Sequence, residues 1–304
     1  MKQRLVIVTG KGGVGKTLVS TALAAEWARR GERTLLVVQS ATDVHHPLLD
    51  VLVRYAPGQA SGFAVCRVDG QSALKEYVHR TVWVPGFYDW FLDGPALRHF
   101  AEAAPGFEEL MCLGKLYDLV TDRSGGGYRR VVFDAPASGH AALMLKVPRV
   151  TAQAVRTGPL HHNAVKIQSM LEDDLTTTVL LVTLAEEMAV REALELAHRL
   201  RGESALRTGP VIANRLMPAL FSDAEARALA TMRDPSPALA TLLGAAAARH
   251  EISTVQRRHL DTLRHAEPRF AEVPEIIAPA FDAQRLIDGV GRALAPWLDG
   301  SRHG

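Results

Sequence analysis

The feature that most constrains this chain is a glycine-rich string that begins at Gly10. Residues 10–17 read Gly-Lys-Gly-Gly-Val-Gly-Lys-Thr and match the G-x-x-x-x-G-K-T pattern of a phosphate-binding loop. The β-branched run 4–9 before the string predicts a buried strand, and the Ala-, Leu- and Glu-rich run 18–30 after it predicts a helix. Strand, loop and helix in this order are the context that the motif requires, so we predict a nucleoside triphosphate site.

The loop residues have distinct expected roles. Backbone N–H groups close around the phosphates, and the N-terminus of the following helix adds partial positive charge. Lys16 is expected to reach the β- and γ-phosphates, and the Thr17 hydroxyl to coordinate Mg²⁺. The predicted nucleotide-binding residues are Gly10, Lys11, Gly12, Gly13, Val14, Gly15, Lys16, Thr17 and Leu18.

A second motif, Asp-Ala-Pro-Ala-Ser-Gly-His, occupies residues 134–140 after the apolar run 130–133. A carboxylate at a strand end is where phosphate-binding-loop enzymes hold Mg²⁺ or its water. Gly139 permits a backbone that rearranges around the γ-phosphate. We predict Asp134 as a catalytic and metal-site residue, the alternative being an aspartate that caps a turn. His140 is either a switch residue or a polar helix cap.

Strands alternate with helices along the chain, which predicts an α/β fold with a doubly wound, mainly parallel sheet. Further predicted strands cover residues 34–38, 130–133, 178–183, 210–214 and 275–278, and further predicted helices cover 189–200 and 283–298. The apolar run 237–248 predicts a buried helix. We expect one domain over residues 1–304, with ligand sites at the carboxyl ends of the strands.

Residues 72–120 differ in character and predict a helical insert within this domain. Aromatic residues crowd into it at Trp83, Phe87, Tyr88, Trp90 and Phe91. Such a cluster either forms a small core of its own or offers a surface to a partner or cargo, because Trp and Phe are frequent interface anchors.

Charge and cysteine content exclude several classes of function. The formal net charge is +2, so no broad nucleic-acid footprint is indicated. Cys66 and Cys112 form no C-x-x-C pair, which argues against a zinc clasp and for a reducing compartment in which both are buried apolar residues. The start of the chain lacks the features of a signal peptide. We expect a cytoplasmic protein without nucleic-acid binding or stable membrane insertion.

The motifs resemble those of the ArsA-type ATPases, a family that includes arsenite-pump ATPases and the eukaryotic ATPase that targets tail-anchored membrane proteins. The resemblance rests on residues 10–17, 134–140 and 182–188, and on Asn214-Arg215 and Val273-Pro274. It implies ATP and Mg²⁺ as ligands and hydrolysis to ADP and phosphate. It also implies that Asn214 contacts the adenine edge, with Arg215 and Pro274 at the same site; an amide carries both the donor and the acceptor that adenine needs.

Lys11 is a second lysine within the loop. It resembles the deviant Walker A lysine of the superfamily that contains MinD, ParA, the nitrogenase iron protein and ArsA. The resemblance implies that Lys11 crosses a dimer interface to the phosphates bound by the partner subunit. The implied assembly is a nucleotide-switched homodimer, or a heterodimer with a paralogous ATPase, coupled to an unidentified partner or cargo.

Two alternatives to this function stay open. A MinD- or ParA-like positioning ATPase needs a membrane-targeting tail or a basic DNA-binding face, and residues 296–304 are too short and not basic enough for either. The other alternative is a regulatory subunit that binds nucleotide but hydrolyses it slowly.

The segment after the second predicted strand departs from the family pattern of Asp-Pro-Ala followed by a water-positioning aspartate. Read without a gap, Ser40 takes the place of the first aspartate and Pro47 that of the second. Shifted by three residues, Asp43 and Asp50 take these places. We favour Asp50 as the catalytic, water-positioning residue and keep Asp43 as its rival, although both also fit ordinary loop or helix-cap positions.

Overall fold

The structure is a computed structural model that describes residues 1–39, 62–70, 72–74, 76, 106–122, 125–232, 235–267, 269–276 and 282–298 of the 304. Its strands are β1 (Leu5–Gly10), β2 (Thr34–Gln39), β3 (Phe63–Val68), β4 (Arg130–Ala137), β5 (Thr177–Leu184), β6 (Thr208–Leu216) and β7 (Phe270–Pro274). Its helices are α1 (Lys16–Arg29), α6 (Phe107–Val120), α7 (Ser138–Ala154), α8 (Pro159–Glu172), α9 (Glu187–Ser204), α10 (Asp223–Ala230), α11 (Pro237–Ala266) and α12 (Ala283–Leu298).

The described strands form one parallel sheet in the order β3-β2-β4-β1-β5-β6-β7, which confirms the predicted α/β fold class. The apolar runs of the central strands are buried on both faces, as parallel sheets require. β1 lies in the middle of the sheet. β2, β3 and β4 lie on one side of it, and β5, β6 and β7 lie on the other side, so the strand order reverses at β1. Ligands of such sheets bind where the strand order reverses, at the carboxyl ends.

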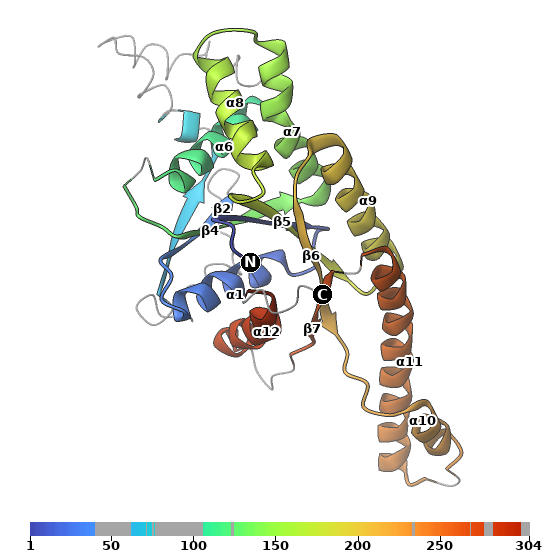
Figure 1. The fold of residues 1–304 in the computed structure, drawn as a ribbon. Coiled ribbons are helices and arrows are strands. Elements are labelled where there is room, and N and C mark those ends of the chain that lie inside the picture. Colours follow the sequence, from blue (N-terminus) through green and yellow to red (C-terminus); the bar gives the residue numbers. More distant parts are fainter. Residues whose placement is uncertain are drawn as a thin grey trace.

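Helices cover both faces of the sheet (Figure 1). α1 and α12 pack together on one face, against a core that includes Val6, Val8 and Ile212. α6, α7, α8, α9 and the second half of α11 cover the other face, against Ile7, Phe133 and the rest of a larger core. No helix among the described residues is both long and apolar enough to span a bilayer.

Two strands differ from the sequence prediction. β3 was not predicted, because only its end residues Phe63 and Val68 are buried and Arg67 interrupts its apolar residues, so this edge strand lacks the long apolar run of its neighbours. The last described strand is β7 at Phe270–Pro274, so the predicted strand is wrong at residues 275 and 276, while residues 277 and 278 lie outside the described part of the chain. Ala271 and Val273 fill the core on alternate positions, whereas Ile276 lies beyond the strand and packs against Gly289.

The predicted burial of residues 237–248 is also wrong. These residues begin α11, but most of their side chains are exposed, and Leu242 keeps 67% of its accessible surface. α11 and α10 project from the body of the molecule as a helical hairpin (Figure 1). An uncharged run alone therefore did not distinguish a core helix from a projecting one.

The cysteines and the insert are described in part. Cys112 is buried in α6, and burial, with Asp69, Glu109 and Glu108, raises the pKa of its thiol to about 12. Cys66 is half-buried on the edge strand, so the expectation that both cysteines are buried holds for Cys112 alone. The predicted insert contributes α6, while its aromatic cluster at 83–91 lies outside the described residues.

Candidate nucleotide-binding site

The phosphate-binding loop joins β1 to α1 at the carboxyl edge of the sheet. Glycine is required at two positions of the loop, because atoms of neighbouring strands lie where a Cβ would be. A Cβ on Gly10 would lie 2.1 Å from the Val182 carbonyl oxygen on β5, and one on Gly15 would lie 2.4 Å from the Asn214 Nδ2 on β6. Both glycines also have a positive φ, at 153° and 93°. The loop is therefore pressed against the ends of the two strands that follow β1 in the sheet.

Asp134 lies on β4 directly beside the start of α1. It is 7% exposed, and one carboxylate oxygen accepts a hydrogen bond from the Thr17 hydroxyl at 2.7 Å. The other oxygen accepts one from the Ser20 hydroxyl at 3.0 Å. The structure thus brings together the two predicted metal-site residues, and the oxygen donors of Thr17 and Asp134 are the kind that Mg²⁺ prefers. Ser20 was not predicted, because it sits inside the helix without a motif of its own.

Lys16 begins α1, and its ammonium donates a hydrogen bond to the Lys11 carbonyl oxygen at 3.0 Å. Burial lowers the pKa of Lys16 below its ordinary value, and the nearby Asp134 carboxylate acts in the opposite direction. The lysine is folded back over its own loop. A half-buried ammonium at the start of a helix is arranged to receive an anion.

The Lys11 side chain points away from Lys16, Thr17 and Asp134. Its ammonium pairs with a carboxylate oxygen of Glu192 on α9 at 2.8 Å, and the two side chains are 40% and 34% exposed. Sequence reasoning did not predict Glu192, because one acidic residue on an amphipathic helix gives no signal. Lys11 is therefore bound within its own chain in this structure.

Asn214 is buried at the end of β6 and lies under the loop. Its Nδ2 donates to the Val14 carbonyl oxygen at 2.9 Å, and its Oδ1 accepts from the Arg215 N–H at 3.0 Å. Arg215 adopts a positive φ of 57°, which turns the chain sharply after the strand. Asn214 thus supports the loop here, and its contact with adenine stays a prediction.

A hollow of about 400 Å³ lies between α11, the ends of β6 and β7, and the chain that leaves β6. Pro274, which the resemblance places at the nucleotide site, lines it together with Leu216. Gln256 of α11 also lines it and holds the chain after Asn214: its Oε1 accepts from the Met217 N–H at 2.8 Å, and its Nε2 donates to the Arg215 carbonyl oxygen at 3.3 Å. No sequence motif marks Gln256.

The remaining predicted residues are His140, Asp43 and Asp50, and Thr9 supports the Asp134 segment. The Thr9 hydroxyl donates to the Pro136 carbonyl oxygen at 2.8 Å, which ties β1 to the Asp134 segment. His140 Nε2 lies 3.4 Å from a Glu109 carboxylate oxygen, on the exposed side of that segment. Asp43 and Asp50 lie outside the described residues. Within the described part of the chain, no three His, Cys, Asp or Glu side chains form a metal-binding group.

Comparison with known proteins gives a consistent result. The model of a family described as anion-transporting ATPase matches residues 3–159. ATPase BagA of Mycobacterium tuberculosis is 30% identical over 232 residues, which cover 71% of this chain and 66% of BagA. ATPase GET3B of Arabidopsis thaliana is 26% identical over 278 residues, covering 73% and 66% of the two chains. ATPase GET3 of Malassezia globosa is 26% identical over 247 residues, covering 68% and 71%. The chain thus spans slightly less than two thirds of the length of BagA and GET3B.

Proposed function

This chain belongs to the anion-transporting ATPase family, and on that premise we propose that it binds ATP with Mg²⁺ and hydrolyses it as a nucleotide-switched dimer. In this proposal, the nucleotide state controls the binding of a partner or cargo protein. The observation that carries it is the hydrogen bond of 2.7 Å between Thr17 and Asp134, which joins the end of the phosphate-binding loop to the second predicted motif.

Binding of the phosphates follows from the loop and the residues that support it. The N–H groups at the start of α1 and the Lys16 ammonium face the same edge of the sheet, where they supply donors and positive charge. The Asn214 side chain, at the end of β6, donates a hydrogen bond to the loop, and the Val182 carbonyl group on β5 lies against Gly10. A loop supported in this way does not have to be ordered when the phosphates bind, which lowers the free-energy cost of binding.

Thr17 and Asp134 would hold Mg²⁺, directly or through its water. When bound, the metal neutralises charge on the β- and γ-phosphates. Two of this chain's own hydroxyls orient the Asp134 carboxylate by hydrogen bonds at 2.7 and 3.0 Å, so its position does not depend on the metal. The water-positioning role remains with Asp50, in preference to Asp43.

Dimerisation is proposed from Lys11. Its side chain is 40% exposed at the edge that carries the loop, and it makes no hydrogen bond within the loop among the described residues. Release from Glu192 would free its ammonium to reach phosphates on another subunit, in a homodimer or in a heterodimer with a paralogous ATPase. ATP would then bridge the two subunits, and hydrolysis would weaken the bridge.

The test is a comparison of nucleotide binding and turnover. Lys16→Ala is expected to abolish binding of a fluorescent ATP analogue, because it removes the cation opposite the phosphate oxygens. Lys166→Ala, which removes the same group from an exposed position on α8, is the matched control and is expected to bind like the wild type. Phosphate release by the wild type should require Mg²⁺. Wild-type affinity in Lys16→Ala would overturn the assignment, and binding without turnover would favour a regulatory subunit.

A further inference from the structure

Thr9 is a polar residue at the end of β1 to which the proposed function gives no role. It is 0% exposed, and it directly precedes Gly10, the first residue of the phosphate-binding loop. Its hydroxyl donates a hydrogen bond of 2.8 Å to the Pro136 carbonyl oxygen, two residues after Asp134. The bond therefore joins the strand that enters the loop to the second predicted motif.

The backbone of β4 is irregular where Thr9 meets it. The β1 residues on either side of Thr9 pair with Asp134 and Ala137, so one residue of β1 lies opposite two residues of β4. This is the count of a β-bulge, a feature that re-aims the chain beside active sites. Pro136 has no N–H group to donate to the ladder, and its carbonyl oxygen accepts from the Thr9 hydroxyl. The side chain of Thr9 thus holds the bulge.

Asp134 and Pro136 are held from opposite faces of the sheet. Ile7 belongs to the core under α6–α9, and Thr9 follows it by two residues on the same strand, so both side chains point to that face. The Asp134 carboxylate points to the other face, where it accepts hydrogen bonds from two hydroxyls of α1. The chain around the bulge is therefore fixed from both sides.

Thr9 itself occupies a fixed position relative to the loop. β1 is the central strand, and its parallel register with β5 is regular through Gly10. A Cβ on Gly10 would lie 2.1 Å from the Val182 carbonyl oxygen, so the end of β1 has no room to shift toward β5. A group that is bonded to Thr9 is therefore held at a defined place beside the phosphate-binding loop.

The chain beyond this bond is exposed at the edge that carries the loop. Pro136 is half-buried, whereas Ala137 and Gly139 are exposed. α7 begins at Ser138 with no side-chain cap and no acidic residue in its first turn. The first N–H groups of a helix have no partner within the helix, and they readily bind phosphate oxygens. The Thr9 bond thus lies where the fixed part of this segment meets its exposed part.

We propose that Thr9 is a positioning residue for recognition of the γ-phosphate. The proposal rests on the proposed function, which places ATP at this edge of the sheet. Through the Pro136 carbonyl group, Thr9 sets where the chain leaves β4, and hence where the N–H groups of residues 137–139 stand relative to the loop. Without the hydroxyl, these groups would be misplaced for the terminal phosphate, while the loop would still bind the other two.

The test compares ADP alone with ADP and beryllium fluoride, which takes the place of the γ-phosphate. A fluorescent ADP analogue is titrated in the presence of Mg²⁺, and the ratio of the two dissociation constants measures the gain from the third phosphate position. Thr9→Val removes the hydroxyl and keeps the branched shape, whereas Thr9→Ser keeps the hydroxyl. Thr34→Val is the matched control: the Thr34 hydroxyl is buried and also donates to a carbonyl oxygen at 2.8 Å, but at the start of β2, on the opposite edge.

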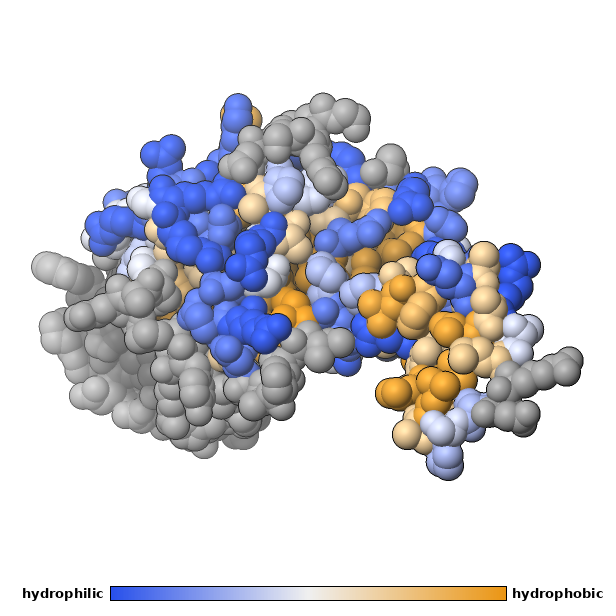
Figure 2. All heavy atoms as spheres, turned by 90° about the horizontal axis from the view of Figure 1, so that it is seen from below, coloured by the Kyte–Doolittle hydropathy of each residue, from blue (hydrophilic) through white to orange (hydrophobic). Residues whose placement is uncertain are grey.

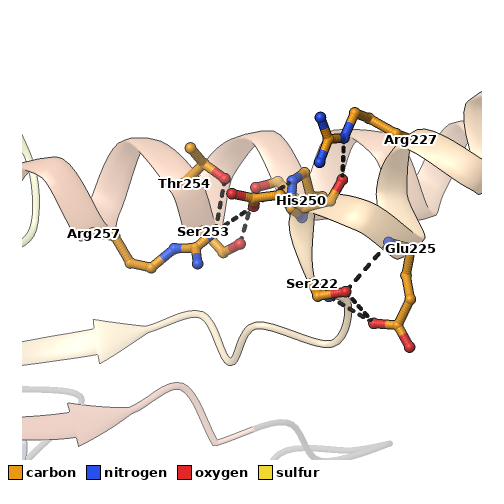
Figure 3. Close-up of polar contacts among 8 residues, drawn as sticks. Ser222, Glu225, Arg227, His250, Ser253, Thr254 and Arg257 are labelled. Atoms are coloured by element: carbon orange, nitrogen blue, oxygen red, sulfur yellow. Dashed lines mark hydrogen bonds and ion pairs between the residues drawn. The ribbon is translucent and has the colours of Figure 1, made fainter.

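A second control lies in the helical hairpin of α10 and α11, on which hydrophobic residues gather (Figure 2). Ser222→Ala removes the capping box that Ser222 forms with Glu225 at the start of α10 (Figure 3). Loss of a cap lowers the stability of the fold. It should leave the gain from beryllium fluoride unchanged, because the cap belongs to a different element from residues 137–139. This variant shows what a loss of stability alone does to nucleotide binding.

Thr9→Val is expected to reduce the gain from beryllium fluoride about tenfold, and kcat by a similar factor, with the affinity for ADP and the KM for ATP little changed. Thr9→Ser, Thr34→Val and Ser222→Ala should keep the gain of the wild type. Thr9→Ala also lacks the hydroxyl and should show the same loss, which keeps the test decisive if Thr9→Val does not fold.

Two results would overturn this inference and leave the proposed function intact. One is a Thr9→Val protein whose melting temperature falls, as in Thr34→Val, while its gain from beryllium fluoride equals that of the wild type; Thr9 would then be a structural residue. The other is an equal loss in Thr9→Ser, which retains the hydroxyl. A wild type that binds ADP but gains nothing from beryllium fluoride would overturn both the inference and the nucleotide switch.

Discussion

The Lys11 ammonium and the Glu192 carboxylate form an ion pair of 2.8 Å that joins the phosphate-binding loop to α9. Lys11 belongs to the loop and Glu192 to α9, 181 residues further along the chain, so the contact depends on the completed fold. A lysine held by its own chain is not available to a second subunit. The pair therefore competes with the intersubunit contact proposed for Lys11.

Glu192→Gln is expected to strengthen ATP-dependent dimerisation. The pair is partly exposed, and such pairs contribute about 0.2–1 kcal/mol, so we expect the dimer association constant to increase by about 1.4- to fivefold for each pair that opens. Glu195→Gln, which removes the same charge from an exposed position one turn along α9, is the control. Weaker dimerisation in Glu192→Gln would mean that Glu192 contributes to the assembled state.

Asp134→Asn is expected to lower Mg²⁺-dependent turnover by about 10–100-fold while nucleotide binding persists. The substitution keeps the shape of the side chain but removes the charge that Thr17 and Ser20 now orient. Phosphate release measured against Mg²⁺ concentration tests this. Ser20→Ala removes one of the two hydrogen bonds and should have a smaller effect; an equal effect would indicate that orientation of the carboxylate, and not its charge, is decisive.

Nucleotide affinity is expected to fall as the pH rises into the alkaline range. Burial lowers the pKa of Lys16, so the free protein loses this charge at a lower pH than an exposed lysine would. Bound phosphates favour the charged form and raise the pKa again, so the affinity is constant below the pKa of the free protein and decreases above it, by at most about tenfold per pH unit. Titrations from about pH 7 to pH 10 would show the decrease, and Lys16→Arg, which stays charged over this range, should flatten it.

Asp50→Asn is expected to preserve ATP binding and lower turnover, because the water would lose the group that orients it. Asp43→Asn should reduce turnover less. Single-turnover measurements separate hydrolysis from binding in both variants. The reverse order of effects would assign the water-positioning role to Asp43.

Gln256→Ala is expected to weaken nucleotide binding although no predicted contact to ATP is removed. The substitution deletes the hydrogen bonds to Met217 and Arg215 that hold the chain beyond Asn214. Gln256→Glu keeps an acceptor for the Met217 N–H but loses the donor, so its affinity should lie between those of Gln256→Ala and the wild type. Equal affinities in all three proteins would show that the ends of β6 and β7 keep their positions without α11.

The sequence carried enough information to predict the fold class and the group formed by Thr17, Lys16 and Asp134. Lys16 and Thr17 are placed locally by a strand, a loop and a helix, and Asp134 lies on β4, a motif strand that pairs with β1 beside the loop. Ser20, Glu192 and Gln256 could not be predicted, because their roles arise from helices that meet the site only after packing. The projection of residues 237–248 was missed for a related reason: an apolar run indicates that a face needs covering but not whether the same molecule supplies the cover.

The length of α11 also makes it a lever. Gln256 fixes the helix to the chain beside the nucleotide site, with Leu263 seven residues to one side and Pro237 nineteen residues to the other. For a rigid helix pivoting at Gln256, the two arms of the lever are about 10 Å and about 28 Å long. A tilt that shifts Leu263 by about 1 Å therefore carries Pro237 through about 3 Å, so a displacement small enough for a packed core to tolerate becomes a visible movement at the tip.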